Sequence, residues 1–177
     1  MSATVLLLSG CASGAVIDVP DSAGSAATAV PTASAAPEPP AATSTAAAAL
    51  DCTTALPAGT VEDRLGLPRG TATPAVVDGD CAYSIAGNPS AVAVSLTPAR
   101  LVDTFTGEGD SRGAASVPLG SAAYWVQGSA ATSTPSELAV LAGGQELHIV
   151  SFVGDQGALL DWAVAVLGSV GVDLVVA

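Results

Sequence analysis

Residues 137–153 read ELAVLAGGQELHIVSFV, in which two apolar-rich segments flank a glycine pair. The segments cover residues 137–142 and 145–153. Gly143-Gly144 between them is a strong signal for the tight turn of a β-hairpin. The stretch therefore predicts two antiparallel strands, around which the neighbouring elements can be placed.

A helix is predicted directly after this hairpin, over residues 155–167. Its apolar residues share one stripe, as expected for a helix that packs on a sheet: Leu159, Leu160, Ala163, Val164 and Leu167. Residues 122–126, before the hairpin, read as a further strand. Residues 172–176 are predicted to form either a final short strand or an extension of the helix.

The earlier part of the chain predicts similar elements. A short helix begins at Thr60, a good N-cap residue, and stops at Gly66. Apolar residues then alternate with smaller ones over 81–85 and over 92–96, which predicts a second hairpin.

A second helix is predicted from Thr97-Pro98 to Gly107, followed by a glycine-rich loop over residues 107–113. Strands followed by a helix thus occur twice. This order predicts an α+β fold, with an antiparallel sheet and its helices packed on one face.

Composition limits the partners of the chain, whose folded domain we place at residues 51–177. The whole chain has sixteen acidic and four basic residues, and its formal net charge is −12. Such a surface repels phosphate backbones, so we expect no nucleic-acid partner. No run of 18 or more apolar residues is present, so we expect no membrane-spanning segment in the mature chain.

Residues 11–50 predict a disordered linker. Residues 22–49 are almost entirely Ala, Ser, Thr and Pro, with Glu38 as the only charge. This composition offers too little apolar surface to offset the entropy of ordering the chain. As a flexible coil the linker would span about 35 Å. An unmodified spacer is expected, with O-glycosylation as the alternative.

Leu8-Ser9-Gly10-Cys11 resembles the lipobox of bacterial lipoproteins. The resemblance implies that residues 1–10 are a signal peptide and that Cys11 becomes the lipid-modified N-terminus. The lipid would hold the protein on the extracytoplasmic face of the cell membrane, since two acyl chains give stable attachment. The alternative is a short buried strand or helix end over residues 4–8 with an incidental cysteine. We expect basic residues in frame upstream of Met1, because a signal peptide normally begins with them.

A second resemblance covers most of residues 51–167. It rests on Cys52, on Gly79-Asp80-Cys81-Ala82-Tyr83 and on residues 117–125, which read VPLGSAAYW. These features are similar to those of secreted actinobacterial lipoproteins with domains of unknown function. Ser121 stands where that family often has an acidic residue. The resemblance implies a surface lipoprotein and supplies no catalytic residue.

Three cysteines leave one pair once Cys11 is assigned to the lipid. Cys52 and Cys81 are therefore predicted to form a disulfide, which the outside of the cell is oxidising enough to preserve. Two buried free thiols are the alternative.

His148 is the only histidine, so any Ser-His-Asp site would have to use it. It lies in a predicted strand, on the opposite face from Leu147 and Ile149. An exposed or sheet-packed histidine is the simpler interpretation.

No metal or cofactor site is predicted. A single histidine and two bridged cysteines leave no ligand set. Asp78-Gly79-Asp80 and Glu108-Gly109-Asp110 lack the further acids of a calcium loop and are read as turns. Tyr124 and Trp125 are adjacent on a strand and face opposite sides. One should fill the core, and the other is the best candidate for an exposed contact.

These features favour a membrane-anchored lipoprotein that displays a small, non-enzymatic binding domain at the cell envelope. The alternative is an envelope hydrolase that uses His148. A serine and a carboxylate beside His148 in a concave site would favour the enzyme. Neither the ligand nor the oligomeric state follows from the sequence.

Overall fold

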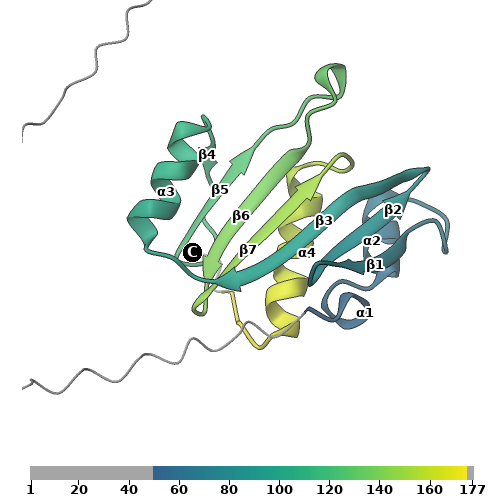
Figure 1. Ribbon diagram of the computed structural model, residues 1–177, viewed down its shortest axis with the longest axis horizontal. Coiled ribbons are helices and arrows are strands. Elements are labelled where there is room, and N and C mark those ends of the chain that lie inside the picture. The colour runs from purple at the N-terminus through teal and green to yellow at the C-terminus, as the bar shows by residue number, and fades with distance from the viewer. Residues whose placement is uncertain (1–49, 175–177) are drawn as a thin grey trace, which may run out of the picture. The chain divides into compact units, whose positions relative to one another are not determined.

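A seven-stranded antiparallel sheet runs through residues 50–174, the part of the chain that the computed structural model describes (Figure 1). Its strands lie in the order β1-β2-β3-β7-β6-β5-β4. They are β1 (Thr73–Val77), β2 (Asp80–Ile85), β3 (Asn88–Pro98), β4 (Ala115–Ser116), β5 (Ala122–Val126), β6 (Ser136–Ala142) and β7 (Gln145–Ser151). The helices are α1 (Cys52–Ala55), α2 (Ala58–Leu65), α3 (Val102–Ser111) and α4 (Gln156–Ser169), with a 3₁₀ turn η1 (Ala130–Thr132).

The predicted fold class, α+β with an antiparallel sheet, is confirmed. The predicted signal peptide, Cys11 and the linker lie outside the described residues, except for Leu50. Leu50 is buried in the core, so the packed domain includes the last residue that was assigned to the linker.

The hairpin of β6 and β7 forms as predicted. Gly143 and Gly144 have φ values of 58° and 77°, in the left-handed region that a two-residue hairpin turn requires. Ala142 pairs with Gln145 across this turn. The hairpin predicted from residues 81–85 and 92–96 is also present, as β2 and β3. Edge strand β1 was not predicted, because its residues are mostly exposed and lack a regular apolar alternation.

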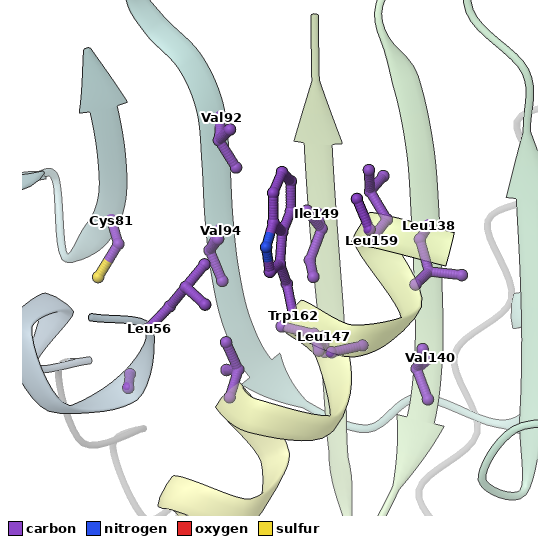
Figure 2. Packing of buried hydrophobic residues seen from close by; sticks show 14 of the residues in the cluster. Leu56, Cys81, Val92, Val94, Leu138, Val140, Leu147, Ile149, Leu159 and Trp162 are labelled. Carbon is purple, nitrogen blue, oxygen red and sulfur yellow. The ribbon is translucent and has the colours of Figure 1, made fainter. Parts of the chain in front are cut away.

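Helix α4 packs on one face of the sheet, and its most buried large residue is Trp162. The indole of Trp162 lies against strand residues that include Val94 and Ile149 (Figure 2). Asp155 caps the helix as its side chain accepts a hydrogen bond from the Ala158 N–H at 2.8 Å. The predicted stripe is partly wrong, because Val164 is 48 % exposed whereas Trp162 is fully buried. The bulk of Trp162 sets which side of the helix faces the sheet.

Helices α1 and α2 lie at the β1–β2 end of the same face (Figure 1). A disulfide joins Cys52 of α1 to Cys81 of β2, the pair predicted from the sequence, with a Cα–Cα distance of 5.4 Å. The Tyr83 hydroxyl donates to the Leu56 carbonyl at 2.6 Å. Burial raises the pKa of this hydroxyl to about 12, so it remains a donor. Helix α1 is thus fixed to the sheet by a covalent bond and a buried hydrogen bond.

The ends of two predicted segments differ from the structure. Helix α2 begins at Ala58 after Pro57, two residues before the predicted start, and stops at Gly66 as predicted. Residues 172–174 are neither strand nor helix. The Val172 N–H donates to the Leu167 carbonyl at 2.9 Å, which ends α4. Residues 175–177 lie outside the described part of the chain.

Helix α3 lies on the opposite face of the sheet, over β5 and β6. The predicted packing of the helices on one face is therefore wrong for α3, and the helix is also wrong in position. Strand β3 continues to Pro98, because Thr97 and Pro98 pair with the start of β7. The helix then runs from Val102 to Ser111, through most of the predicted glycine-rich loop.

Within residues 50–174, no helix combines the length and the apolar character needed to cross a membrane.

Candidate functional site

His148 lies on the face of the sheet that carries α3, between two buried carboxylates. Its Nε2 is 2.9 Å from Oε1 of Glu146, which precedes it by two residues on β7. Its Nδ1 is 3.4 Å from Oε1 of Glu137 on β6. The register explains both contacts: His148 pairs with Ala139, so Glu137 is its diagonal neighbour on the same face. The His148 side chain is 23 % exposed, while the side chains of Glu137 and Glu146 are 9 % and 6 % exposed.

Two arginines, one on each side of α3, pair with these carboxylates. Arg100 lies before the helix and forks onto Glu146, with its Nε 2.8 Å from Oε2. Arg112, the C-cap residue, forms a second forked pair with Glu137. Both arginines also approach Glu108 of α3, at 2.5 Å for Arg100 and 3.7 Å for Arg112. We call these side chains the ionic cluster: Arg100, Glu108, Arg112, Glu137, Glu146 and His148.

The pKa values of the cluster follow from these contacts. Burial alone would raise the pKa of Glu137, but hydrogen bonds from His148 and Arg112 outweigh it and lower the pKa to about 2. The same balance, with Arg100 as the main donor, lowers the pKa of Glu146. Hydrogen bonds to Glu137 raise the pKa of His148 against the opposing effect of burial. With His148 protonated, the three cations match the three carboxylates.

The cluster holds α3 on the sheet around a small apolar centre. Phe105 of α3 is fully buried and packs on Tyr124 of β5, with ring centroids 4.9 Å apart. Arg100 and Arg112 hold the two ends of the helix on either side of this contact. The arrangement is therefore that of a structural ion-pair network.

The hydrogen-bonding partners of His148 are two carboxylates, and no serine bonds to it within residues 50–174. This arrangement does not supply the nucleophile that the hydrolase alternative needs. Among the described residues, no group of three or more His, Cys, Asp or Glu side chains is placed to hold a metal ion. Asp78 and Gly79 form the β1–β2 turn, as predicted, but Glu108 and Asp110 lie within α3 rather than in a turn.

A cavity of about 420 Å³ lies at one end of the sheet, where β5, β6 and β7 terminate. We call it the loop cavity, because residues of the β5–β6 loop, 127–135, and of the β7–α4 loop, 152–155, line it. The two loops lie at the same end of the sheet (Figure 1). Its volume is within the range of small-molecule sites in proteins. Trp125 contributes from the core, and Phe152, which is 48 % exposed, contributes from the rim.

Neutral polar groups line the rest of the loop cavity: Gln127, Ser129, Ser133, Thr134, Ser136 and Gln156. Gln127 and Gln156 are exposed to solvent, so their amides are open to a ligand. Asp155 is the only ionisable lining residue, and its carboxylate caps α4.

The loop above the cavity is internally bonded. Ser129 and Thr134 exchange backbone hydrogen bonds of 2.9 and 3.0 Å. The Gly128 N–H donates to Ser136 Oγ at 3.0 Å. A Cβ atom at Gly128 would lie 2.4 Å from the backbone of Pro135 and Ser136, so only glycine allows this approach. The cavity is thus formed without a ligand.

The structure corrects the prediction for the adjacent aromatic residues. Tyr124 and Trp125 face opposite sides of the sheet, as predicted. Both are buried, at 4 % and 9 % exposure, so neither is the exposed contact that was expected. Tyr124 is covered by α3, and the exposed aromatic of the cavity is Phe152.

Part of the ionic cluster could have been predicted from the sequence. Glu146 and His148 are two residues apart on a strand and must share a face. A two-residue turn at Gly143-Gly144 also fixes the β6–β7 register, which places Glu137 beside His148. The cavity residues gave no such signal, because neutral side chains between residues 125 and 156 meet only where two loops fold together.

Comparisons of the chain with protein-family models, with curated proteins and with solved structures found no match. A functional proposal therefore rests on the residues and their geometry.

Proposed function

We propose that the protein is a lipid-anchored binding protein of the extracytoplasmic face of the cell membrane, and that its domain binds a ligand in the loop cavity without catalysing a reaction. The cavity carries this proposal. The cavity is present without a ligand and has the size of a small-molecule site. The groups that line it can form hydrogen bonds, and none of them is a nucleophile activated by a neighbouring base.

The anchor is proposed from the sequence at Leu8-Ser9-Gly10-Cys11. Two acyl chains on Cys11 would hold the mature N-terminus at the membrane, and the Ala/Ser/Thr/Pro-rich segment would separate the domain from it. The partners of this proposal are the membrane, through the lipid, and a ligand of the envelope.

The anchor is tested by metabolic labelling with an alkynyl fatty acid in cells that express the gene with its natural upstream region. The wild-type protein should be labelled and recovered with membranes, whereas Cys11→Ala should be unlabelled and appear in the medium. Cys52→Ala/Cys81→Ala is the matched control and should keep the label. Labelling of Cys11→Ala would refute lipidation at this residue.

The cavity is tested with the unlipidated full chain, Cys11→Ala, against fractions of an envelope extract. A ligand that binds only the folded state raises the melting temperature. Gln156→Trp places a large side chain at the cavity and should abolish this rise, while Gln145→Trp, at the start of β7, should keep it. If no fraction raises the melting temperature, or if Gln156→Trp responds as the parent does, binding in the loop cavity is refuted.

A further inference from the structure

The chemistry of the loop cavity defines a class of ligand, and this inference rests on the proposed binding function. We propose that the loop cavity binds a neutral sugar ring, which stacks on Phe152 and exchanges hydrogen bonds with Gln127 and Gln156.

The negative net charge of the chain and its few, already paired arginines argue against an anionic ligand. The chain has only four basic side chains, all arginines, and a net charge of −12. Each arginine already forms an ion pair with a carboxylate: Arg64 with Asp161, Arg69 with Asp63, Arg100 with Glu146 and Arg112 with Glu137. None of them lines the cavity. A phosphate or carboxylate ligand would therefore enter a negative field without a cation to pair with.

The N-terminus of α4 does not change this conclusion. Asp155 and Gln156 bring the first turn of the helix to the cavity wall, where the helix dipole would favour an anion. The Asp155 carboxylate occupies that position, since it accepts from the Ala158 N–H at 2.8 Å. That bond uses Oδ1 alone and leaves the Asp155 carboxylate charged, so a cationic sugar is the competing ligand that the titration must include.

The remaining polar groups match hydroxyls. An amide side chain presents two donors and an acceptor, and a serine hydroxyl both donates and accepts. A sugar hydroxyl also donates and accepts, so neighbouring hydroxyls pair with such groups without leaving one unsatisfied. Gln127 comes from the β5–β6 loop and Gln156 is the first residue of α4, so the two amides can hold a ring from both sides.

Phe152 supplies the apolar half of the site. Phe152 is 48 % exposed, although it lies among polar side chains that line the cavity. Aromatic faces carry a partial negative charge and attract the weakly positive C–H groups of an apolar face. A sugar ring has such a face on one side and hydroxyls around its edge.

An extended peptide is the other neutral ligand that combines polar and apolar groups. Peptides commonly bind by adding a strand to a free sheet edge. The strands that end at the cavity are β5, β6 and β7, and each of them is paired on both sides. Their backbones are therefore not open to a peptide, and the available partners are side chains.

Isothermal titration of the full chain carrying Cys11→Ala tests the proposal with maltotriose, mannotriose and triacetylchitotriose as neutral probes. Glucuronic acid and glucosamine serve as charged probes, and trialanine serves as the peptide probe. At least one neutral sugar should bind more tightly than the charged and peptide probes. Tighter binding of a charged sugar or of trialanine would overturn the proposal, as would the absence of binding by all three neutral sugars.

Two pairs of variants place the sugar in the loop cavity. Phe152→Leu keeps apolar area without an aromatic face and should weaken binding by about fivefold, whereas Phe152→Tyr should retain it. Gln156→Ala should weaken binding about tenfold, and Gln145→Ala, outside the cavity, should not. Equal affinity of Phe152→Leu and the parent would overturn the stacking role.

The outcomes separate this inference from the proposed function. If envelope fractions raise the melting temperature through the cavity while every neutral sugar fails, the cavity binds another class of ligand and only the sugar is refuted. If neither the envelope fractions nor the neutral sugars bind, both the proposed binding function and the sugar inference are refuted. Cosedimentation with insoluble glucan, mannan and chitin distinguishes the sources of the sugar: binding to a polymer identifies a wall or storage glycan, and binding to trisaccharides alone identifies a soluble one.

Discussion

His148 is the only histidine of the chain, so it dominates any change in folding stability just above pH 6. Its pKa in the folded protein is raised above the ordinary 6.5, first by the hydrogen bond to Glu137 and then by Glu146. Protonated His148 therefore stabilises the fold. This contribution is complete below pH 6.5 and is lost as the pH rises through the folded-state pKa.

We predict that the free energy of unfolding of the parent protein falls as the pH rises above 6.5, with a slope of at most about 1.4 kcal/mol per pH unit. In His148→Gln this slope should disappear, because glutamine does not titrate. Urea unfolding between pH 5.5 and 9 measures the slope in both proteins. The N-terminal amine also titrates in this range, but it is common to both proteins and does not affect their difference. An unchanged slope in His148→Gln would show that the histidine is not linked to folding.

The packing of α3 on the sheet depends on Gly109, and no sequence pattern marks this role. Gly109 lies against the ring of Tyr124, and a Cβ atom there would lie 2.8 Å from the ring carbon Cδ1. Gly107 is also helical, but a Cβ there would meet nothing within 4 Å. The two glycines have the same local conformation and differ only in what they face.

Alanine at these two positions should therefore act in opposite directions. Gly107→Ala should stabilise the protein by up to about 1 kcal/mol, because alanine favours helix. Gly109→Ala should destabilise it by roughly 1 to 3 kcal/mol, because the methyl group forces Tyr124 and Phe105 apart. Thermal unfolding of Gly107→Ala and Gly109→Ala measures the two changes in stability. A stabilising effect of Gly109→Ala would mean that α3 does not lie this close to β5.

Gly107 and Gly109 also show why some elements could be predicted from the sequence and α3 could not. Strands β5, β6 and β7 were found because apolar alternation and the Gly143-Gly144 turn are local signals. The span of α3 could not be found in this way, since Gly107 and Gly109 lower helix propensity and read as a loop. The helix is selected by contacts on the other side of the sheet, with Phe105 on Tyr124 and an arginine at each end.

Across the domain, the Cys52–Cys81 disulfide closes a covalent loop with a sequence separation of 29. Such a loop restricts the unfolded chain and contributes roughly 3 to 4 kcal/mol to stability. That is a large share of the ~5 to 15 kcal/mol typical of a domain. The core has few aromatic side chains, two each of Trp, Tyr and Phe in the chain, so the covalent bond supplements packing by smaller groups.

We predict that Cys52→Ala/Cys81→Ala in the Cys11→Ala background loses roughly 3 to 4 kcal/mol of unfolding free energy. Denatured Cys11→Ala protein should show no reactive thiol before reduction and two after it. Two thiols without reduction would mean that the bridge does not form. The double variant also serves as the matched control, because reducing agent should leave its melting temperature unchanged.

The overall architecture followed from the sequence more fully than the candidate site did. The two hairpins and α4 are marked by local sequence patterns, whereas the loop cavity is set by two loops that meet at the end of the sheet. Trp125, Gln127 and Phe152 have no shared spacing that would mark them as neighbours. Only the register of β5, β6 and β7 brings them together.

The position of the disulfide also determines how the domain responds to mechanical load. If Cys11 carries the proposed lipid, a pull on the protein is transmitted through its N-terminal chain and reaches the folded domain at Leu50 and, two residues later, at Cys52. From there the sulfur atoms pass the force to Cys81 on β2, a strand hydrogen-bonded to both β1 and β3. The first turn of the domain cannot peel away under tension, and the pull is shared across the width of the sheet.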